Sequence, residues 1–148
     1  RVGLNQDNPD AQSNDGCDAA IIKIEPKKKM LYFTGAKLDL FKVSKNKTTK
    51  YSANRISLGY KEPLDEEPVE TVIDYNEGDT FVVVTDGLTD QIGEKERKSY
   101  GYKRIKNILN TNLKSDAKKI GEKLKNDFLN WQGNEKRRDD VTFIAFTL

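Results

Sequence analysis

The chain has 148 residues, 35% of them hydrophobic and 34% charged, which suits one domain with a usable core and a heavily charged surface. Its 26 Lys and Arg side chains nearly balance its 24 Asp and Glu side chains, and the net charge of +2 argues against a dedicated nucleic-acid binder. No apolar run approaches the roughly 18 residues of a membrane span, and no signal-peptide pattern is present. The single cysteine, Cys17, excludes an internal disulfide and is compatible with a reducing cytoplasm.

The absence of histidine narrows the chemistry further. A Ser-His-Asp triad, a Cys-His pair and histidine-ligated zinc are all excluded within this chain. Any metal must be held by oxygen ligands, which favours Mg²⁺, Mn²⁺ or Ca²⁺. Because the chain begins at Arg1 rather than Met, we expect that an upstream segment belongs to the same protein.

Short apolar runs in the first half of the chain predict β-strands. The first three runs should form an antiparallel meander with tight connections, and a lysine-rich turn should follow at Ser44–Lys50. Further along, one run alternates apolar and polar residues as a half-buried strand does, and the next is the most hydrophobic stretch of the chain and predicts a central strand. In order, the predicted strands are Ala19–Glu25, Met30–Gly35, Leu38–Val43, Tyr51–Ile56, Val69–Tyr75 and Thr80–Thr85.

Beyond Asp86 the apolar period becomes helical. One short amphipathic helix is expected around Tyr102–Leu109. A second is expected after Ser115 as its N-cap, and Gly133 should end it. The apolar stripe of this second helix favours core packing over a ligand site, and it comprises Ala117, Ile120, Leu124, Phe128 and Trp131. Asp140–Leu148 is predicted to be a final buried strand, so the fold class is α+β.

Acidic residues lie at two strand boundaries. Asp86 follows the predicted central strand and is itself followed by Gly87, a placement that suits a hard-metal ligand fixed by a sheet but open to solvent. Asp90 would return to the same face if Gly87–Gln91 forms a helical turn. Asp139 and Asp140 precede the last strand, and they would converge with Asp86 if that strand pairs beside Thr80–Thr85. Taken singly, each motif is more often an ordinary solvated turn than a functional site, and the spacing alone leaves the two interpretations open.

Six short blocks, taken in order, resemble the PPM-type (protein phosphatase 2C-like) phosphatases over nearly the whole chain. More narrowly, the blocks resemble the bacterial branch of the stage-II sporulation and sigma-regulator phosphatases. Within that branch they look most like the SiaA-type members, which are usually tethered to membrane-embedded sensor segments. The blocks are Asn14–Ala19, Phe33–Lys37, Ser57–Tyr60, Glu77–Asp79, Val84–Gln91 and Arg138–Thr142.

The resemblance implies an α-β-β-α sandwich of two antiparallel sheets flanked by helices, with a Mn²⁺ or Mg²⁺ pair. By that resemblance Asp86 and Asp139 match metal ligands, Asp90 matches a third-metal position, Asp140 and Gly87 lie beside the site, and Lys37 lies on the substrate side. The implied reaction is attack of a metal-bound hydroxide on a phosphoserine or phosphothreonine, typically of a STAS-type anti-sigma-factor antagonist. The resemblance also implies a cytoplasmic domain of a membrane-anchored parent, and is compatible with a homodimer formed through the parent's regulatory segments.

One family motif has no match here. The first metal motif is an Asp-Gly upstream of the Asp18 strand, but Arg1–Ser13 holds only Asp7 and Asp10 and no Asp-Gly. Residues 1–148 are therefore expected to be the C-terminal portion of a single phosphatase domain that lacks its bridging aspartate. The main alternative is a metal-free pseudophosphatase that binds a STAS-like partner, and an unrelated α+β module is a third hypothesis. Retention of Asp86 and Asp139 favours the phosphatase.

Overall fold

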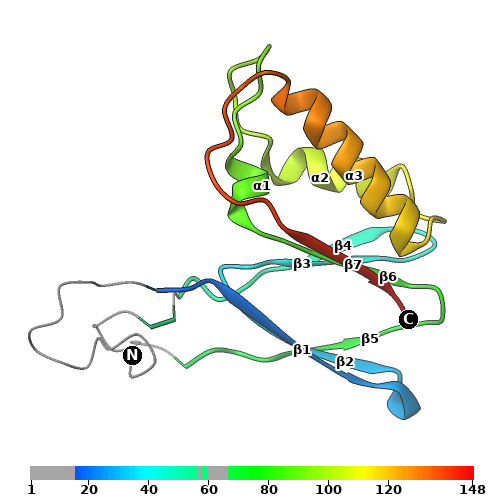
Figure 1. The fold of residues 1–148 in the computed structure, drawn as a ribbon. Helices are drawn as coiled ribbons and strands as arrows, with labels where there is room; N and C mark the ends of the chain where they lie inside the picture. Colours follow the sequence, from blue (N-terminus) through cyan, green and yellow to red (C-terminus); the bar gives the residue numbers. More distant parts are fainter. Residues whose placement is uncertain (1–15, 57, 60–66) are drawn as a thin grey trace, which may run out of the picture. The chain divides into compact units, whose positions relative to one another are not determined.

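The computed structural model describes residues 16–56, 58–59 and 67–148, and it divides the chain into two compact units (Figure 1). Unit 1 comprises residues 1–39 and 52–74, and unit 2 comprises residues 40–51 and 75–148. The predicted α+β class is confirmed, because each unit has its own antiparallel sheet and unit 2 adds helices. The candidate residues upstream of Gly16, namely Asp7, Asp10 and Asp15, lie outside the described residues.

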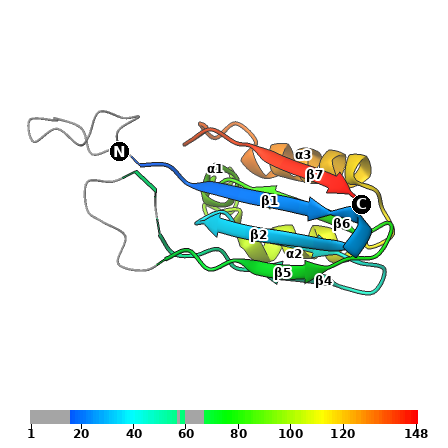
Figure 2. The same ribbon diagram turned by 90° about the horizontal axis from the view of Figure 1, so that it is seen from below.

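Unit 1 contains a three-stranded antiparallel sheet in the order β1-β2-β5, with the strands side by side in Figure 2. Strands β1 and β2 form a hairpin through a short 3₁₀ turn, which begins at a proline as such turns often do. Side chains alternate between a buried face, which includes Leu31, Phe33 and Ile73, and an exposed one. The elements are β1 (Ala19–Glu25), η2 (Pro26–Lys28), β2 (Met30–Ala36) and β5 (Thr71–Asp74).

Unit 2 contains a four-stranded antiparallel sheet in the order β4-β3-β6-β7, together with three helices. The most hydrophobic run of the sequence lies inside this sheet as β6, so the prediction of a central strand there is confirmed. The elements are β3 (Leu40–Val43), β4 (Thr48–Tyr51), β6 (Thr80–Val84), α1 (Asp86–Asp90), α2 (Gly101–Asn110), α3 (Ala117–Gln132) and β7 (Phe143–Thr147).

Helices α2 and α3 pack on one face of the unit 2 sheet (Figure 1). The apolar stripe of α3 behaves as its period predicts, since Ile120, Leu124 and Phe128 are buried. Trp131 is half-buried, and its ring stands edge-on to the Tyr100 ring. The buried core is completed by Tyr100, which precedes α2, and by residues of the two central strands, α1 and α2, namely Phe41, Val43, Val82, Val84, Leu88, Ile105 and Leu109.

The ion pairs of unit 2 include Lys42 with Asp79 and Arg104 with Asp127. Lys42 in β3 meets Asp79 at 3.1 Å, and both side chains are less than 10% exposed. Arg104 in α2 binds the carboxylate of Asp127 in α3 through two nitrogens, at 2.6 and 3.1 Å, and the Tyr100 hydroxyl donates to the same carboxylate. Burial raises the pKa of Asp127, but the hydrogen bonds from Arg104 and Tyr100 outweigh it and hold that pKa below its usual value.

The predicted three-strand meander is wrong at its second connection, because β2 and β3 belong to different sheets. β2 ends at Ala36, and Lys37 then adopts a left-handed conformation (φ 61°) that a continuing strand cannot contain. The side chain of Asp39 accepts a hydrogen bond from the Ala53 amide at 2.8 Å. The chain therefore leaves unit 1 after this segment and enters β3.

Three further boundaries differ from prediction. The strand expected at Tyr51–Ile56 is instead β4 at Thr48–Tyr51, because the turn closes early through a hydrogen bond from Ser44 N to Lys47 O. The N-cap of α3 is Asp116 rather than Ser115, since its carboxylate accepts the Lys119 amide at 2.8 Å. The last strand is shorter and less buried than predicted: β7 begins at Phe143 rather than Asp140, and it is an edge strand among the described strands.

Candidate metal centre

The two acidic motifs of unit 2 lie beside each other because β6 and β7 pair antiparallel. Val84 at the end of β6 stands opposite Phe143 at the start of β7. The pairing continues one step further, where the Thr85 amide donates to Thr142 O at 3.0 Å and the Thr142 amide donates to the Thr85 hydroxyl at 3.0 Å. The strand pairing on which the convergence of the two motifs depended is therefore confirmed.

Gly87 is the point of closest approach between the two motifs. A Cβ placed on Gly87 would overlap the carbonyl oxygen of Asp140 and would lie 3.3 Å from the Cβ of Asp139. Gly87 itself is buried. The glycine thus allows the backbone after Asp86 to pack directly against the backbone of the Asp139-Asp140 pair, as close backbone contacts require.

The four aspartates of this region, Asp86, Asp90, Asp139 and Asp140, are exposed. The Asp140 amide donates to Asp139 Oδ1 at 2.7 Å, which orients that carboxylate. Asp86 and Asp90 are the first and last residues of α1, so the predicted helical turn is confirmed and the four-residue spacing puts both on one helix face. The Thr89 hydroxyl lies 3.1 Å from Asp90 Oδ1 and 3.0 Å from the backbone oxygen of Asp86.

Gln91 is a buried polar residue that the sequence analysis did not single out. Its side chain is fully buried, and its Nε2 donates to Ile92 O at 3.0 Å and to Lys136 O at 3.1 Å. Its Oε1 accepts the Arg138 amide at 3.3 Å. One side chain therefore ties the end of α1 to the loop that leads into Asp139, and the only sequence signal is its place directly after the Asp86–Asp90 block.

The substrate-side candidate, Lys37, belongs to unit 1, whereas the four aspartates belong to unit 2. Its ammonium group lies 3.7 Å from Asp18 Oδ1, and its backbone amide donates to Asn54 O at 2.9 Å. Lys37 thus has an acidic neighbour at the entry of β1. The exposed ammonium group and this weak pairing leave its side chain accessible to an anion.

The donor set suits a hard cation but is sparse. Asp86 and Asp139 offer oxygen ligands, the type that Mg²⁺ and Mn²⁺ prefer. Within residues 16–56, 58–59 and 67–148, however, no group of three or more acidic or cysteine side chains is arranged to hold an ion. These residues therefore fit one part of a metal site rather than a full coordination sphere.

Solved structures of protein phosphatase 2C domains share this fold. The SiaA-PP2C domain of Pseudomonas aeruginosa matches with a TM-score of 0.79 and 22% identity, covering 90% of this chain and 52% of that one. The Mn-presoaked phosphatase domain of SpoIIE from Bacillus subtilis matches with a TM-score of 0.63 and 15% identity, covering 88% and 56%. RsbX in complex with magnesium matches with a TM-score of 0.59 and 18% identity, covering 88% and 55%. The fold is thus PP2C-like, and the chain spans about half the length of these structures.

Residues 4–148 match the family model described as Stage II sporulation protein E (SpoIIE). The chain belongs to this family, and the resemblance to PPM-type phosphatases is confirmed. A comparison with curated protein sequences finds no significant match. Among the described residues, no helix is both long enough and apolar enough to cross a bilayer.

Proposed function

We propose that this chain is the C-terminal part of a single metal-dependent protein serine/threonine phosphatase domain. The observation that carries the proposal is the contact between the Asp86-Gly87 turn and the Asp139-Asp140 pair at the ends of paired strands. In a family of phosphatase fold, the backbone contact that places Asp86-Gly87 against Asp139 and Asp140 is more than two solvated turns require. The substrate would be a phosphorylated regulatory protein, and a STAS-type anti-sigma-factor antagonist fits the bacterial branch to which the chain belongs.

Asp86 and Asp139 would hold Mn²⁺ or Mg²⁺ together with ligands from outside the described residues. When bound, the metal would lower the pKa of water and offset the charge of the phosphoryl oxygens. The protein's own contribution is position, since the Asp140 amide orients the Asp139 carboxylate and Gly87 sets its distance from α1. Hydrolysis joins a water oxygen to phosphorus, breaks the bond to the seryl or threonyl oxygen and returns a proton to that oxygen.

Asp90 and Asp140 would act beside the principal ligands. Asp90 shares a helix face with Asp86 and is proposed as a weaker cation ligand, whereas Asp140 serves chiefly through its backbone. Lys37 is proposed to face the substrate phosphate. We also propose a cytoplasmic setting within a membrane-anchored parent, whose regulatory segments would provide any homodimer contact.

The decisive experiment replaces Asp86 or Asp139 with Asn in the complete phosphatase domain. Each change removes one charge at nearly constant shape, so kcat/KM for a phosphoserine protein at limiting Mn²⁺ should fall about 100-fold or more, on the order of 3 kcal/mol. Calorimetric titration should show weaker Mn²⁺ binding, while the melting temperature without metal stays close to that of the parent domain. Glu122→Gln, on the exposed side of α3, is the matched control.

Because the described residues offer few carboxylates for a metal, a metal-free pseudophosphatase is the second candidate function. The same experiment distinguishes it from an active phosphatase. A pseudophosphatase would show no chelator-sensitive phosphate release in the parent domain. It would still bind the partner protein equally well in the presence and absence of Mn²⁺. Wild-type rates in both Asn variants at limiting Mn²⁺ would instead mean that these aspartates are turn formers.

A further inference from the structure

A basic surface adjoins the candidate metal centre and is not used by the proposed chemistry. It is the loop 135–138, which leads directly into Asp139. With Ile92 and Arg97 this loop lines an open pocket of about 390 Å³. The lining residues are Ile92, Arg97, Glu135, Lys136, Arg137 and Arg138, so the lining holds four cations and one carboxylate.

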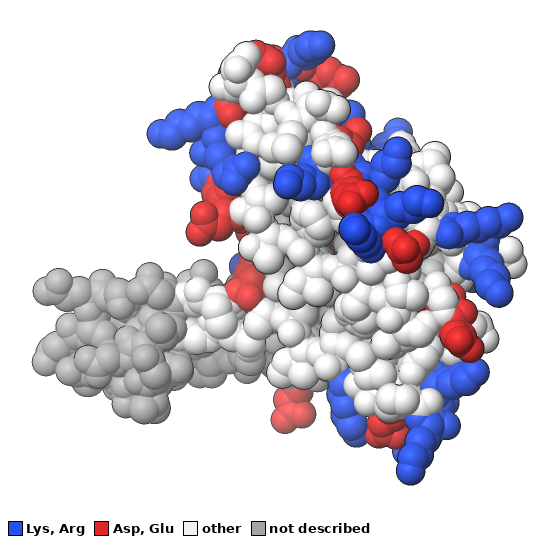
Figure 3. Space-filling view, turned by 45° about the vertical axis from the view of Figure 1, so that its right-hand side comes forward, with Lys and Arg blue, Asp and Glu red and all other residues white. Residues whose placement is uncertain are grey.

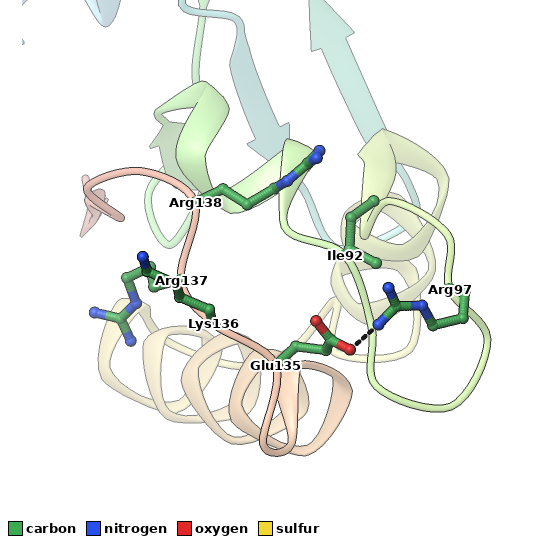
Figure 4. A pocket seen from close by; sticks show the side chains of 6 residues that line it. All are labelled: Ile92, Arg97, Glu135, Lys136, Arg137 and Arg138. Carbon is green, nitrogen blue, oxygen red and sulfur yellow. Dashed lines mark hydrogen bonds and ion pairs between the residues drawn. The ribbon is translucent and has the colours of Figure 1, made fainter.

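The cationic side chains of this surface differ in whether they already have a partner within the protein. Arg97 is paired with Glu135, as Figure 4 shows. Arg137 stacks near Phe128, with its guanidinium 5.9 Å from the ring centroid. For Lys136 and Arg138, no carboxylate partner is found among the described residues. Arg138 extends toward the side of the pocket where Ile92 lies, and Lys136 extends to the opposite side (Figure 4).

The backbone of this basic loop is fixed rather than merely solvated. The buried Gln91 side chain binds Lys136 O and the Arg138 amide, so the loop is anchored on both sides of Arg137. On the face drawn in Figure 3, Lys and Arg side chains are interspersed with Asp and Glu side chains. A held loop loses less conformational entropy when it binds a ligand, which distinguishes it from an ordinary solvated charge run.

We propose that the loop 135–138 docks an acidic segment of the phosphoprotein substrate, next to the phosphorylated residue. The inference rests on the proposed phosphatase function, because that function identifies the docked ligand as a phosphoprotein. Arg138 is the immediate neighbour of Asp139, so a peptide whose phosphate lies at the aspartates must pass this loop. Carboxylates flanking the phosphorylated residue would then meet Lys136 and Arg138, and each exposed charge pair would add up to about fivefold in affinity.

The test uses two peptides and the complete phosphatase domain. One peptide carries a phosphoserine flanked by three glutamates, and the other carries glutamines at the same positions. For the wild-type domain, kcat/KM should be about tenfold higher for the glutamate peptide than for the glutamine peptide. This ratio should shrink as the salt concentration rises from about 50 to about 300 mM. The double variant Lys136→Glu with Arg138→Glu should bring the ratio to one or below. Because each protein is compared with itself, any change in its metal site cancels from the ratio.

The matched control reverses two exposed lysines of α3, Lys118→Glu with Lys125→Glu, and should retain the tenfold ratio. Binding is measured separately by fluorescence anisotropy on the same peptides with serine in place of phosphoserine. A preference for the acidic peptide that survives without any hydrolysis would refute the phosphatase function but support the docking surface. Equal affinity for both peptides, or a preference that persists in the Lys136 and Arg138 variant, would overturn the docking proposal. Equally tight binding of an oligothymidine would also overturn it, by showing a general anion site.

Discussion

Replacing Gln91 with Leu is the sharpest test of how the two halves of the candidate centre are held together. Leu has nearly the same volume, so the change removes hydrogen bonds without opening a large cavity. It deprives the carbonyls of Ile92 and Lys136 of a donor and the Arg138 amide of an acceptor. At about 1 kcal/mol per hydrogen bond, and with water able to reach the exposed loop, we expect a loss of about 2–3 kcal/mol.

The assay is thermal melting of the complete phosphatase domain together with hydrogen exchange. A domain of this size loses about 2–4 °C per kcal/mol, so the melting temperature should fall by about 5–10 °C. The Arg138 amide should exchange at least tenfold faster, because its acceptor is gone. Gln91→Ala should cost more than Gln91→Leu, since a cavity adds to the lost hydrogen bonds.

Gln132→Leu is the control, because Gln132 is only half-buried and its side chain makes fewer hydrogen bonds: Nε2 donates to Glu135 O at 3.0 Å, and Oε1 accepts a long bond from Arg137 Nη2 at 3.5 Å. It should cost less than about 1 kcal/mol. A Gln91→Leu protein that melts within about 1 °C of the parent, with unchanged exchange at Arg138, would refute the argument. The loop would then be held by packing alone.

Three further perturbations test other contacts. Gly87→Ala places a Cβ against the Asp140 carbonyl, so it should cost about 1–3 kcal/mol in thermal melts and weaken Mn²⁺ binding by calorimetry; unaltered values in both would mean that the two turns are not in contact. Lys42→Met leaves the Asp79 carboxylate buried without its cation and should cost about 3–5 kcal/mol in urea titrations. Adding Asp79→Asn should recover part of that loss, and no recovery would argue against an ion pair. The pKa of Asp127 is lowered in the folded state, so its ion pair stabilises the fold above the unfolded pKa of about 4 and is lost as the pH falls through the folded value. The melting difference between the parent and Asp127→Asn should therefore shrink below about pH 4, and a constant difference down to pH 2.5 would contradict this.

Hydrophobic periodicity predicted those elements of the fold that depend on local sequence. The run at residues 80–85 has enough β-branched residues to specify a central strand, and the stripe of α3 specifies one buried helix face. Sheet membership could not be predicted in the same way. β2 and β3 are close in sequence, but a left-handed Lys37 and the Asp39 side chain direct the chain into a second sheet.

The candidate centre was predicted to a similar extent. Asp86 and Asp139 could be singled out because each lies at the boundary of a recognisable strand, and their proximity followed once β6 and β7 paired. Gln91 could not be singled out, because its hydrogen-bond partners Trp131, Lys136 and Arg138 lie far along the chain. A polar residue gains its role there from tertiary contacts, and no local pattern records such contacts.

The interleaving of the two units bears on how the protein is made. The chain passes from one unit to the other after Asp39, after Tyr51 and after Asp74, so neither unit is a continuous stretch. The β3–β4 hairpin leaves the ribosome early, whereas β7 is synthesised after all other described strands, a delay of roughly five to twenty seconds at about 5–20 residues per second. Until then the β6 edge that β7 covers is open to other strands. Soluble yield should therefore depend on translation speed and on chaperones that shield nascent strands.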